Sequence, residues 1–198
     1  ITQALNSAFY YGRGGKGCPI IFSSGNNTPY AVQYPACLSS VLAVGAIKLN
    51  DSLWYYSQYG DNLDLVAPSG DVSYQGDFFS TDQAGKNGIN YPGPNLNCQP
   101  GLPEDEDYMC NFGGTSAACP IVAGVAALIL AKDSNLYAYE VYNILDSSAV
   151  TKLASDTITP PDPQYGWGRV DAFRAILSIS RGDLNNDNSI ATILDLTF

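Results

Sequence analysis

The sequence predicts an α/β protein, a three-layer α/β/α sandwich around a mostly parallel sheet. Three short segments are apolar throughout and do not alternate with polar residues, which is typical of parallel strands covered on both faces. Longer apolar segments that carry the start and stop signals of helices lie between or after these three segments. Such helices can form the crossover connections that join parallel strands. At 198 residues the chain is long enough for one packed core and too short for two full domains.

The predicted elements can be placed in chain order. A first helix ends at the glycines between residues 12 and 17. The predicted strands are 19–22, 40–47 and 63–68. Residues 69–114 are rich in Gly, Pro, Asn and Asp, which indicates long loops with a hairpin near residues 78–81. The remaining predicted helices are 116–131, 138–148 and 170–179.

Composition excludes two kinds of partner. With 9 basic and 19 acidic residues, the formal charge is -10, which repels a phosphate backbone, so we expect no nucleic-acid partner. The apolar segment 117–131 has 15 residues and is shorter than the roughly 20 that span a bilayer, so we expect a core helix and no membrane span. The sequence starts at Ile1 without a recognisable signal, which suggests a piece of a longer protein.

Five cysteines are too few for a disulfide scaffold, and their odd number leaves at least one outside any internal pair. Cys98 and Cys110 bracket a loop rich in Gly, Pro and Asn, which a local disulfide could join. Free thiols at both positions are the alternative.

One segment is typical of a catalytic serine. Gly113 and Gly114 precede Thr115, Ser116 and an apolar helix. A helix N-terminus offers unpaired N–H groups and a positive dipole end, and both stabilise a nearby oxyanion. Capping of the helix by Thr115 or Ser116 is the alternative. The sequence contains no histidine, although such a serine normally needs one.

The segment GGTSAACPIVAG resembles the nucleophile motif of the subtilisin-like (subtilase, peptidase S8) serine proteases, with Cys119 where that family commonly has alanine. Three further segments resemble the family in its own order: IIFSSGNN, YPACLSSVLAVGAI and YGWGRVDAFRAI. The resemblance extends over about residues 1–180 and implies the subtilisin-like form of the predicted sandwich.

The resemblance implies that Ser116 is the nucleophile, and that the Asn26 side chain and the Ser116 backbone N–H form the oxyanion hole. For Asn26, a role as a turn residue is the alternative. Subtilases carry their catalytic Asp and His before the serine, and this sequence begins after both positions, so the domain is expected to be truncated at its N-terminal side and inactive alone. A catalytically inactive relative that serves as a binding or scaffolding domain is the rival hypothesis.

The resemblance also implies a substrate pocket. Ser23, Ser24 and Gly25 are expected along one wall, with Asn27 and Gln33 near the base. None of them is charged, which favours uncharged P1 side chains over basic ones. The Tyr34–Pro35 peptide bond is a candidate for the cis form by the same likeness.

The last residues form a second predicted unit, so that 1–181 is the catalytic part and 182–198 begins a calcium-binding repeat that resembles a dockerin. Its expected ligands are Asp183, Asn185, Asp187, Ser189 through its carbonyl, and Asp195. Leu194 occupies the twelfth position, where a carboxylate is usual, and an Asx-rich linker is the alternative.

The cofactor and partners follow from these interpretations. We expect no organic cofactor, structural calcium, polypeptide substrates and a docking partner for the C-terminal repeat. The acidic segment 104–107 is interpreted as a solvated loop in preference to a cation site. The resemblance implies a secreted, extracellular or cell-surface protein.

Overall fold

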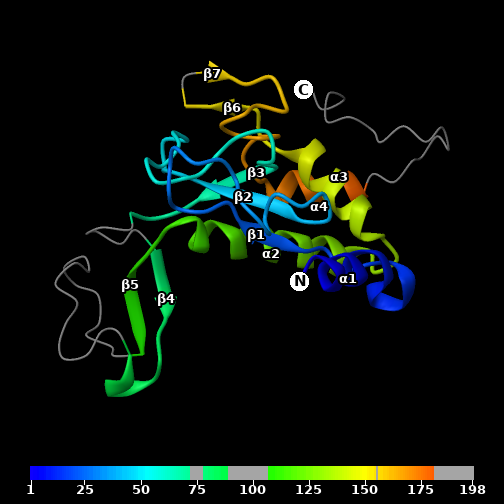
Figure 1. Cartoon of the computed structure of the whole chain (residues 1–198), viewed down its shortest axis with the longest axis horizontal. Coiled ribbons are helices and arrows are strands. Elements are labelled where there is room, and N and C mark those ends of the chain that lie inside the picture. The colour runs from blue at the N-terminus through cyan, green and yellow to red at the C-terminus, as the bar shows by residue number, and fades with distance from the viewer. Residues whose placement is uncertain (72–77, 89–106, 155, 181–198) are drawn as a thin grey trace.

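The computed structural model describes residues 1–71, 78–88, 107–154 and 156–180. Its elements, in chain order, are α1 (Thr2–Gly15), β1 (Ile21–Ser23), β2 (Leu42–Ile47), β3 (Leu65–Pro68), β4 (Phe78–Thr81), the 3-10 helix η1 (Gly85–Asn87), β5 (Tyr108–Phe112), α2 (Thr115–Lys132), α3 (Ala138–Ser148), β6 (Lys152–Leu153), β7 (Asp156–Thr157) and α4 (Ala172–Ser180). Figure 1 shows the main sheet at the centre, with α2 on one side and the small β6–β7 ribbon on the other.

The main sheet is parallel, as predicted. Its described strands lie in the order β1-β2-β3, with Ile21 opposite Leu42 and Val44 opposite Leu65. All six residues of β2 are buried, because side chains on both faces of this central strand contact the core. This burial explains why β2 is apolar throughout.

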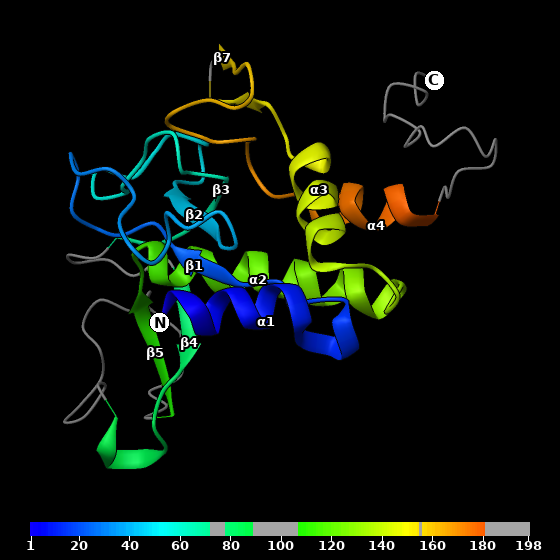
Figure 2. The same ribbon diagram turned by 45° about the vertical axis from the view of Figure 1, so that its right-hand side comes forward.

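Helices cover one face of the sheet. Leu42, Val44 and Leu65 on this face belong to a core cluster with Val122 of α2 and Leu145 of α3. The cluster also includes Ala175 of α4. Figure 2 shows α2 running beneath the sheet, with α3 and α4 above its C-terminal half.

Within the described residues, loops and the short strand β6 cover the opposite face. Ala43, Ile47 and Val66 of this face cluster with Val32 and Leu153, which lie outside the main sheet and the helices. The α/β class and the parallel sheet are therefore confirmed, and the two faces are covered by different kinds of structure.

Helix α2 contains 18 residues, three more than the apolar segment that suggested it, because it begins at Thr115 and continues to Lys132. By length and composition alone it is long and apolar enough to cross a membrane. In this fold its buried residues, including Val122 and Ile129, pack into the core. Packing in the core accounts for the apolar composition of α2.

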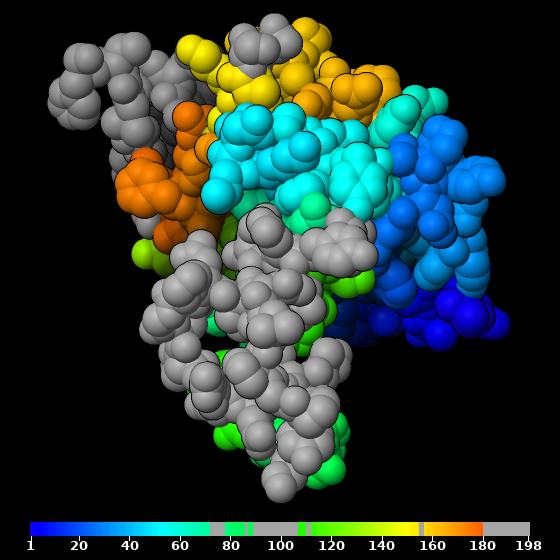
Figure 3. Space-filling model, turned by 90° about the vertical axis from the view of Figure 1, so that its left-hand side faces the viewer, coloured from blue at the N-terminus to red at the C-terminus, as the bar shows by residue number. Residues whose placement is uncertain are grey.

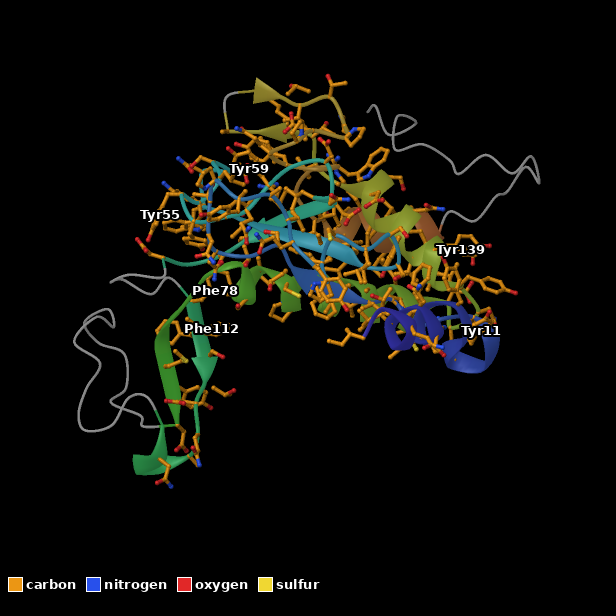
Figure 4. All side chains as sticks on the ribbon, in the orientation of Figure 1. Tyr11, Tyr55, Tyr59, Phe78, Phe112 and Tyr139 are labelled. Atoms are coloured by element: carbon orange, nitrogen blue, oxygen red, sulfur yellow. The ribbon has the colours of Figure 1, made fainter. Side chains whose placement is uncertain are left out.

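The predicted hairpin near residues 78–81 is found only in part, because strand β4 lies there but its partner strand β5 is distant in the sequence. Strand β4 pairs antiparallel with β5, with Phe78 opposite Phe112. Both phenylalanines lie where the hairpin leaves the rest of the molecule, and the paired strands extend away from it (Figure 4). The hairpin ends three residues before α2, so it leads directly into the helix that carries Ser116.

Candidate active site

Ser116 is the second residue of α2 and is exposed. Gly114 before the helix has φ 76° and ψ 175°, a backbone conformation that favours glycine. It is the N-cap residue, and the helix has no side-chain cap hydrogen bond, which argues against the capping alternative. The first-turn N–H groups form the positive end of the helix dipole, so negative charge on a ligand beside Ser116 would be stabilised.

The turn before Ser116 is fixed by a neighbouring loop. The Ser69 hydroxyl donates to the Gly114 carbonyl at 2.6 Å, and the Tyr56 hydroxyl donates to the Gly70 carbonyl at 2.6 Å. A Cβ on Gly113 would lie 2.7 Å from the Gly70 oxygen, so only glycine permits this approach. Burial raises the pKa of Tyr56 to about 12, which keeps its hydroxyl protonated as a donor.

Tyr56 belongs to an aromatic group in the segment between β2 and β3. Its ring stacks on Trp54 with centroids 5.6 Å apart, and the Trp54 Nε1–H donates to the Ser69 carbonyl at 2.7 Å. In Figure 3 this segment, coloured cyan, forms part of the surface above the hairpin. The loop that positions the Ser116 turn is thus held by two aromatic side chains.

Asn26 follows β1 and lies beside the start of α2. Its Oδ1 accepts hydrogen bonds from the Thr115 backbone N–H at 2.9 Å and from the Thr115 hydroxyl at 2.8 Å. Both bonds use the oxygen of the side chain, which leaves the amide N–H₂ group as the part that can donate to a ligand. The structure therefore brings Asn26 to the residue next to Ser116, as expected.

Thr115 contacts the candidate site more closely than its expected role as a possible cap suggests. Besides its bonds to Asn26, its Oγ1 accepts a hydrogen bond from the Gly25 N–H at 3.2 Å. It is 1% exposed, so water cannot replace these bonds. The Thr-Ser pair gave a signal for the helix start, but the partner on the distant β1 loop has no local signature.

The predicted pocket residues lie in the segment that leaves β1 and in the loop after it. Ser23 ends the strand, and Ser24 is buried, with a hydroxyl that has no hydrogen-bond partner in the described part of the chain. Asn27 and Gln33 are exposed. Gly25 lies between Ser24 and Asn26 with φ 112°. The Tyr34–Pro35 bond is cis, which confirms that prediction.

Gln58 is a second residue that the sequence analysis missed. It is 4% exposed, and its backbone N–H donates to the Gly25 carbonyl at 2.9 Å. Its Nε2 donates to the Ala31 carbonyl at 2.9 Å and to the Tyr30 carbonyl at 3.2 Å. Gln58 thus fixes both ends of the segment that contains Asn26.

Cys119 lies one turn after Ser116 in α2. Its Sγ is 3.5 Å from the Ile21 carbonyl, and burial raises the pKa of its thiol. A raised pKa disfavours the nucleophilic thiolate of Cys119. Cys18, Cys37 and Cys119 are free thiols among the described residues.

The Subtilase family pattern (peptidase S8) matches residues 1–168. The chain belongs to the subtilase family. The structure therefore describes a subtilase in which Ser116, Thr115 and Asn26 come together at the start of α2.

Curated relatives include the calcium-dependent protease of Nostoc sp., which is 36% identical over 185 residues covering 87% of this chain. Subtilisin Savinase of Lederbergia lenta is 32% identical over 175 residues covering 88% of this chain. The alignments include 26% of the Nostoc protein and 50% of Savinase. The chain thus spans about half or less of the length of these subtilases.

Solved structures agree with the fold. A protease of Pseudoalteromonas arctica has 27% identity and a TM-score of 0.63, over 89% of this chain and 45% of that one. A serine protease of Aeromonas sobria has 19% identity and a TM-score of 0.73, over 90% of this chain and 39% of that one. The subtilisin-like α/β fold predicted from the sequence is confirmed.

Three expectations fall wholly or partly outside the described residues. They are the calcium ligands Asp183, Asn185, Asp187, Ser189 and Asp195, the Cys98–Cys110 disulfide, and the acidic segment 104–107, of which only Asp107 is described. In the described part of the chain, no group of three or more His, Cys, Asp or Glu residues could hold a metal ion.

Proposed function

We propose that this chain is the C-terminal part of the catalytic domain of a serine endopeptidase, with Ser116 as its nucleophile. The observation that carries the proposal is the pair of hydrogen bonds from Thr115 to Asn26 Oδ1 beside an exposed Ser116. This pair uses only the oxygen of the Asn26 side chain, and it supports the proposal because the amide N–H₂ group remains to donate to a developing oxyanion. Membership of the subtilase family and relatives named as proteases support the same activity.

In the proposed reaction, Ser116 Oγ attacks the carbonyl carbon of the scissile peptide bond. The Asn26 amide and the Ser116 backbone N–H donate to the oxyanion of the tetrahedral intermediate. Collapse of that intermediate releases the amine product and leaves an acyl group on Ser116, which water then hydrolyses. The backbone N–H is available because first-turn groups have no intrahelical partner.

The proton of Ser116 must go to a base outside these residues. The sequence contains no histidine, and subtilases order their triad as Asp, His and Ser along the chain. We therefore infer that the Asp and His motifs lie upstream in the natural protein, and that residues 1–198 alone do not hydrolyse peptides.

The proposed primary pocket takes uncharged P1 side chains. Ser23, Ser24, Gly25, Asn27 and Gln33 offer hydroxyl, amide and backbone groups and no carboxylate. A basic P1 side chain would require a negative partner when desolvated. Peptide libraries cleaved by the full-length enzyme should show preference for uncharged over basic P1 residues.

We also propose a structural calcium site in residues 182–198. Asp183, Asn185, Asp187, the Ser189 carbonyl and Asp195 supply oxygen ligands of the type that calcium takes. The Nostoc relative is named a calcium-dependent protease, which supports a calcium requirement. We propose further that the protein is secreted and that this repeat binds a docking partner. The protein that carries both Asp183→Ala and Asp187→Ala should no longer bind calcium at residues 182–198, and calorimetry measures this loss.

The decisive experiment treats the full-length protein with a fluorophosphonate probe and locates the label by mass spectrometry. Label on Ser116, with none on a Ser116→Ala control, supports the endopeptidase. A folded full-length protein that is unlabelled and lacks the upstream His would instead be the binding or scaffolding relative. Unlabelled protein that retains both upstream residues should become labelled after removal of a propeptide, and failure to do so would contradict the proposal.

A further inference from the structure

A cavity of about 550 Å³ lies between the end of α1 and the beginning of α3. Its lining includes Phe9 and Tyr10 from α1, and Tyr137, Tyr139 and Asp146 from α3 and its N-terminus. These residues are separate from those around Ser116, and the proposed peptidase reaction uses none of them. A volume of this size accommodates a small organic group.

Asp146 supplies a carboxyl group among the residues that line the cavity. Its Oδ1 is buried and has no hydrogen-bond partner in the described residues. Burial and, second, the negative charge of Asp64 raise the pKa of Asp146 to about 8. Buried carboxylate oxygens are normally paired, so the Asp146 side chain lacks a donor, and Asp146 is one of the residues that line the cavity.

Neighbouring polar groups already have partners. The Tyr142 hydroxyl donates to the Ile20 carbonyl at 2.7 Å and accepts from the Ile20 N–H at 2.8 Å. Lys16 also lines the cavity, but its Nζ donates to Asn135 Oδ1 at 2.8 Å. Within the described residues it forms no ion pair with Asp146. Asp146 therefore has no ion-pair partner within the described residues, although the Lys16 ammonium lines the same cavity.

Aromatic rings form another wall. Tyr137 stacks on Tyr139 with centroids 5.6 Å apart, and Phe9 meets Tyr10 edge to face at 5.0 Å. Tyr10 and Tyr139 are 55% and 54% exposed, so their rings are accessible. Figure 4 labels Tyr139 near Tyr11, at the end of the molecule where α1 finishes. The faces of such rings attract cations and pack against aliphatic stems.

We propose that this cavity binds an organic cation, an alkylammonium or guanidinium group, that pairs with Asp146. Its stem lies against the rings of Tyr10, Tyr137 and Tyr139. A metal ion is a poorer occupant, because the described residues include no group of three candidate ligands. The cation can come from a Lys or Arg side chain of a peptide or from a free amine, and the two sources share this chemistry.

The test uses the full-length protein with Ser116→Ala, which prevents cleavage of the probes. Calorimetry compares 3-phenylpropylammonium with neutral 3-phenylpropanol, and N-acetyl-arginine methylamide with its citrulline analogue. Each cation should bind at least about tenfold more tightly than its neutral counterpart. Tight binding of the arginine derivative indicates a peptide ligand, and tight binding of the amine alone indicates a free amine.

Two variants locate the binding. Asp146→Asn should weaken cation binding about tenfold, whereas the matched Asp61→Asn, which removes an exposed carboxylate elsewhere, should not. Tyr139→Ala removes an exposed ring without disturbing the core and should weaken binding severalfold. Equal affinity for the amine and the alcohol, or unchanged affinity in both Asp146→Asn and Tyr139→Ala, would overturn the proposal.

Proton release provides an independent readout. Because the pKa of Asp146 is raised to about 8, cation binding at about pH 7 should release a proton, and binding at about pH 9.5 should release almost none. Asp64, Tyr142 and Lys16 face the same region and are unchanged in Asp146→Asn, so release that persists in this variant contradicts the assignment. Calcium that displaces the amine and loses affinity in Asp146→Asn would identify a metal site and overturn the proposal.

Discussion

Thr115 and Asn26 are joined by two hydrogen bonds, from the Thr115 N–H at 2.9 Å and from its hydroxyl at 2.8 Å, both to Asn26 Oδ1. Because Thr115 immediately precedes Ser116, the proposed nucleophile and the proposed oxyanion donor belong to one hydrogen-bonded unit. The two partners are 89 residues apart in the sequence. Substitutions in this unit should therefore affect catalysis more than substrate binding.

Asn26→Leu should lower kcat about a hundred- to a thousandfold, the loss typical of removing one oxyanion-hole donor in a subtilisin. KM should change little, because the lost bond forms mainly in the transition state. Steady-state kinetics of the full-length enzyme on a peptide substrate measure both constants. Asn62→Leu, at an exposed asparagine outside the proposed site, is the control, and an equal loss in that variant would remove the special role of Asn26.

Thr115→Val should lower kcat about tenfold with little change in KM, whereas Thr115→Ser should restore most of the activity. Valine keeps the shape but removes the donor to Asn26 and leaves the Gly25 N–H without its acceptor. Serine retains both bonds. If valine and serine are equally active, the threonine hydroxyl does not position Asn26.

Gly25→Ala should lower the free energy of unfolding by about 1–3 kcal/mol. The φ of 112° is unfavourable for alanine, and the added Cβ would lie 1.6 Å from Gln58 Oε1. Denaturant unfolding of the full-length protein, with Ser7→Ala at an exposed position of α1 as control, measures the loss. If the free energy of unfolding of Gly25→Ala equals that of the unsubstituted protein, the segment around residue 25 adjusts to the added Cβ without a measurable cost.

Asp146→Asn should stabilise the protein at pH 8–9 by about 1–3 kcal/mol and have little effect near pH 4. The native state raises the pKa of Asp146 from 3.8 to about 8, so it binds this proton more tightly than the unfolded state does. Stability therefore falls as pH rises between these two values and stays low above them. Thermal unfolding across this range measures the difference, which should vanish at low pH. If the stability difference between Asp146→Asn and the unsubstituted protein is the same at every pH, the effect comes from packing and not from the charge of Asp146.

Much of the fold could be predicted because local sequence and tertiary packing agree. Strand β2 is apolar throughout because both its faces are buried, and α3 extends over the predicted residues 138–148. The partner of β4 was not predicted, since β5 lies 26 residues further on, after a segment without periodicity. Pairing between strands so distant in the sequence leaves no local pattern.

Some site residues were predicted and others were not, because contacts between residues distant in the sequence leave no local pattern. Ser116 and Asn26 stand in segments that resemble subtilase motifs, so the proximity of these segments could be expected and was found. Thr115 and Gln58 act through bonds to the distant segment 25–31, and a lone buried glutamine carries no signal of such a role. The cavity beside Asp146 depends on the approach of α1 and α3, which neither helix encodes alone.

Helix α2 carries Ser116 in its first turn and the buried side chains of Val122, Val125 and Ile129 in the turns that follow. The peptide amides of those later turns should exchange with solvent only when the whole domain unfolds, because their side chains occupy the centre of the core. The proposed nucleophile is therefore anchored to the cooperative unit that unfolds last. Its orientation depends on the stability of the domain itself, through the helix and through the loop that fixes the turn before it.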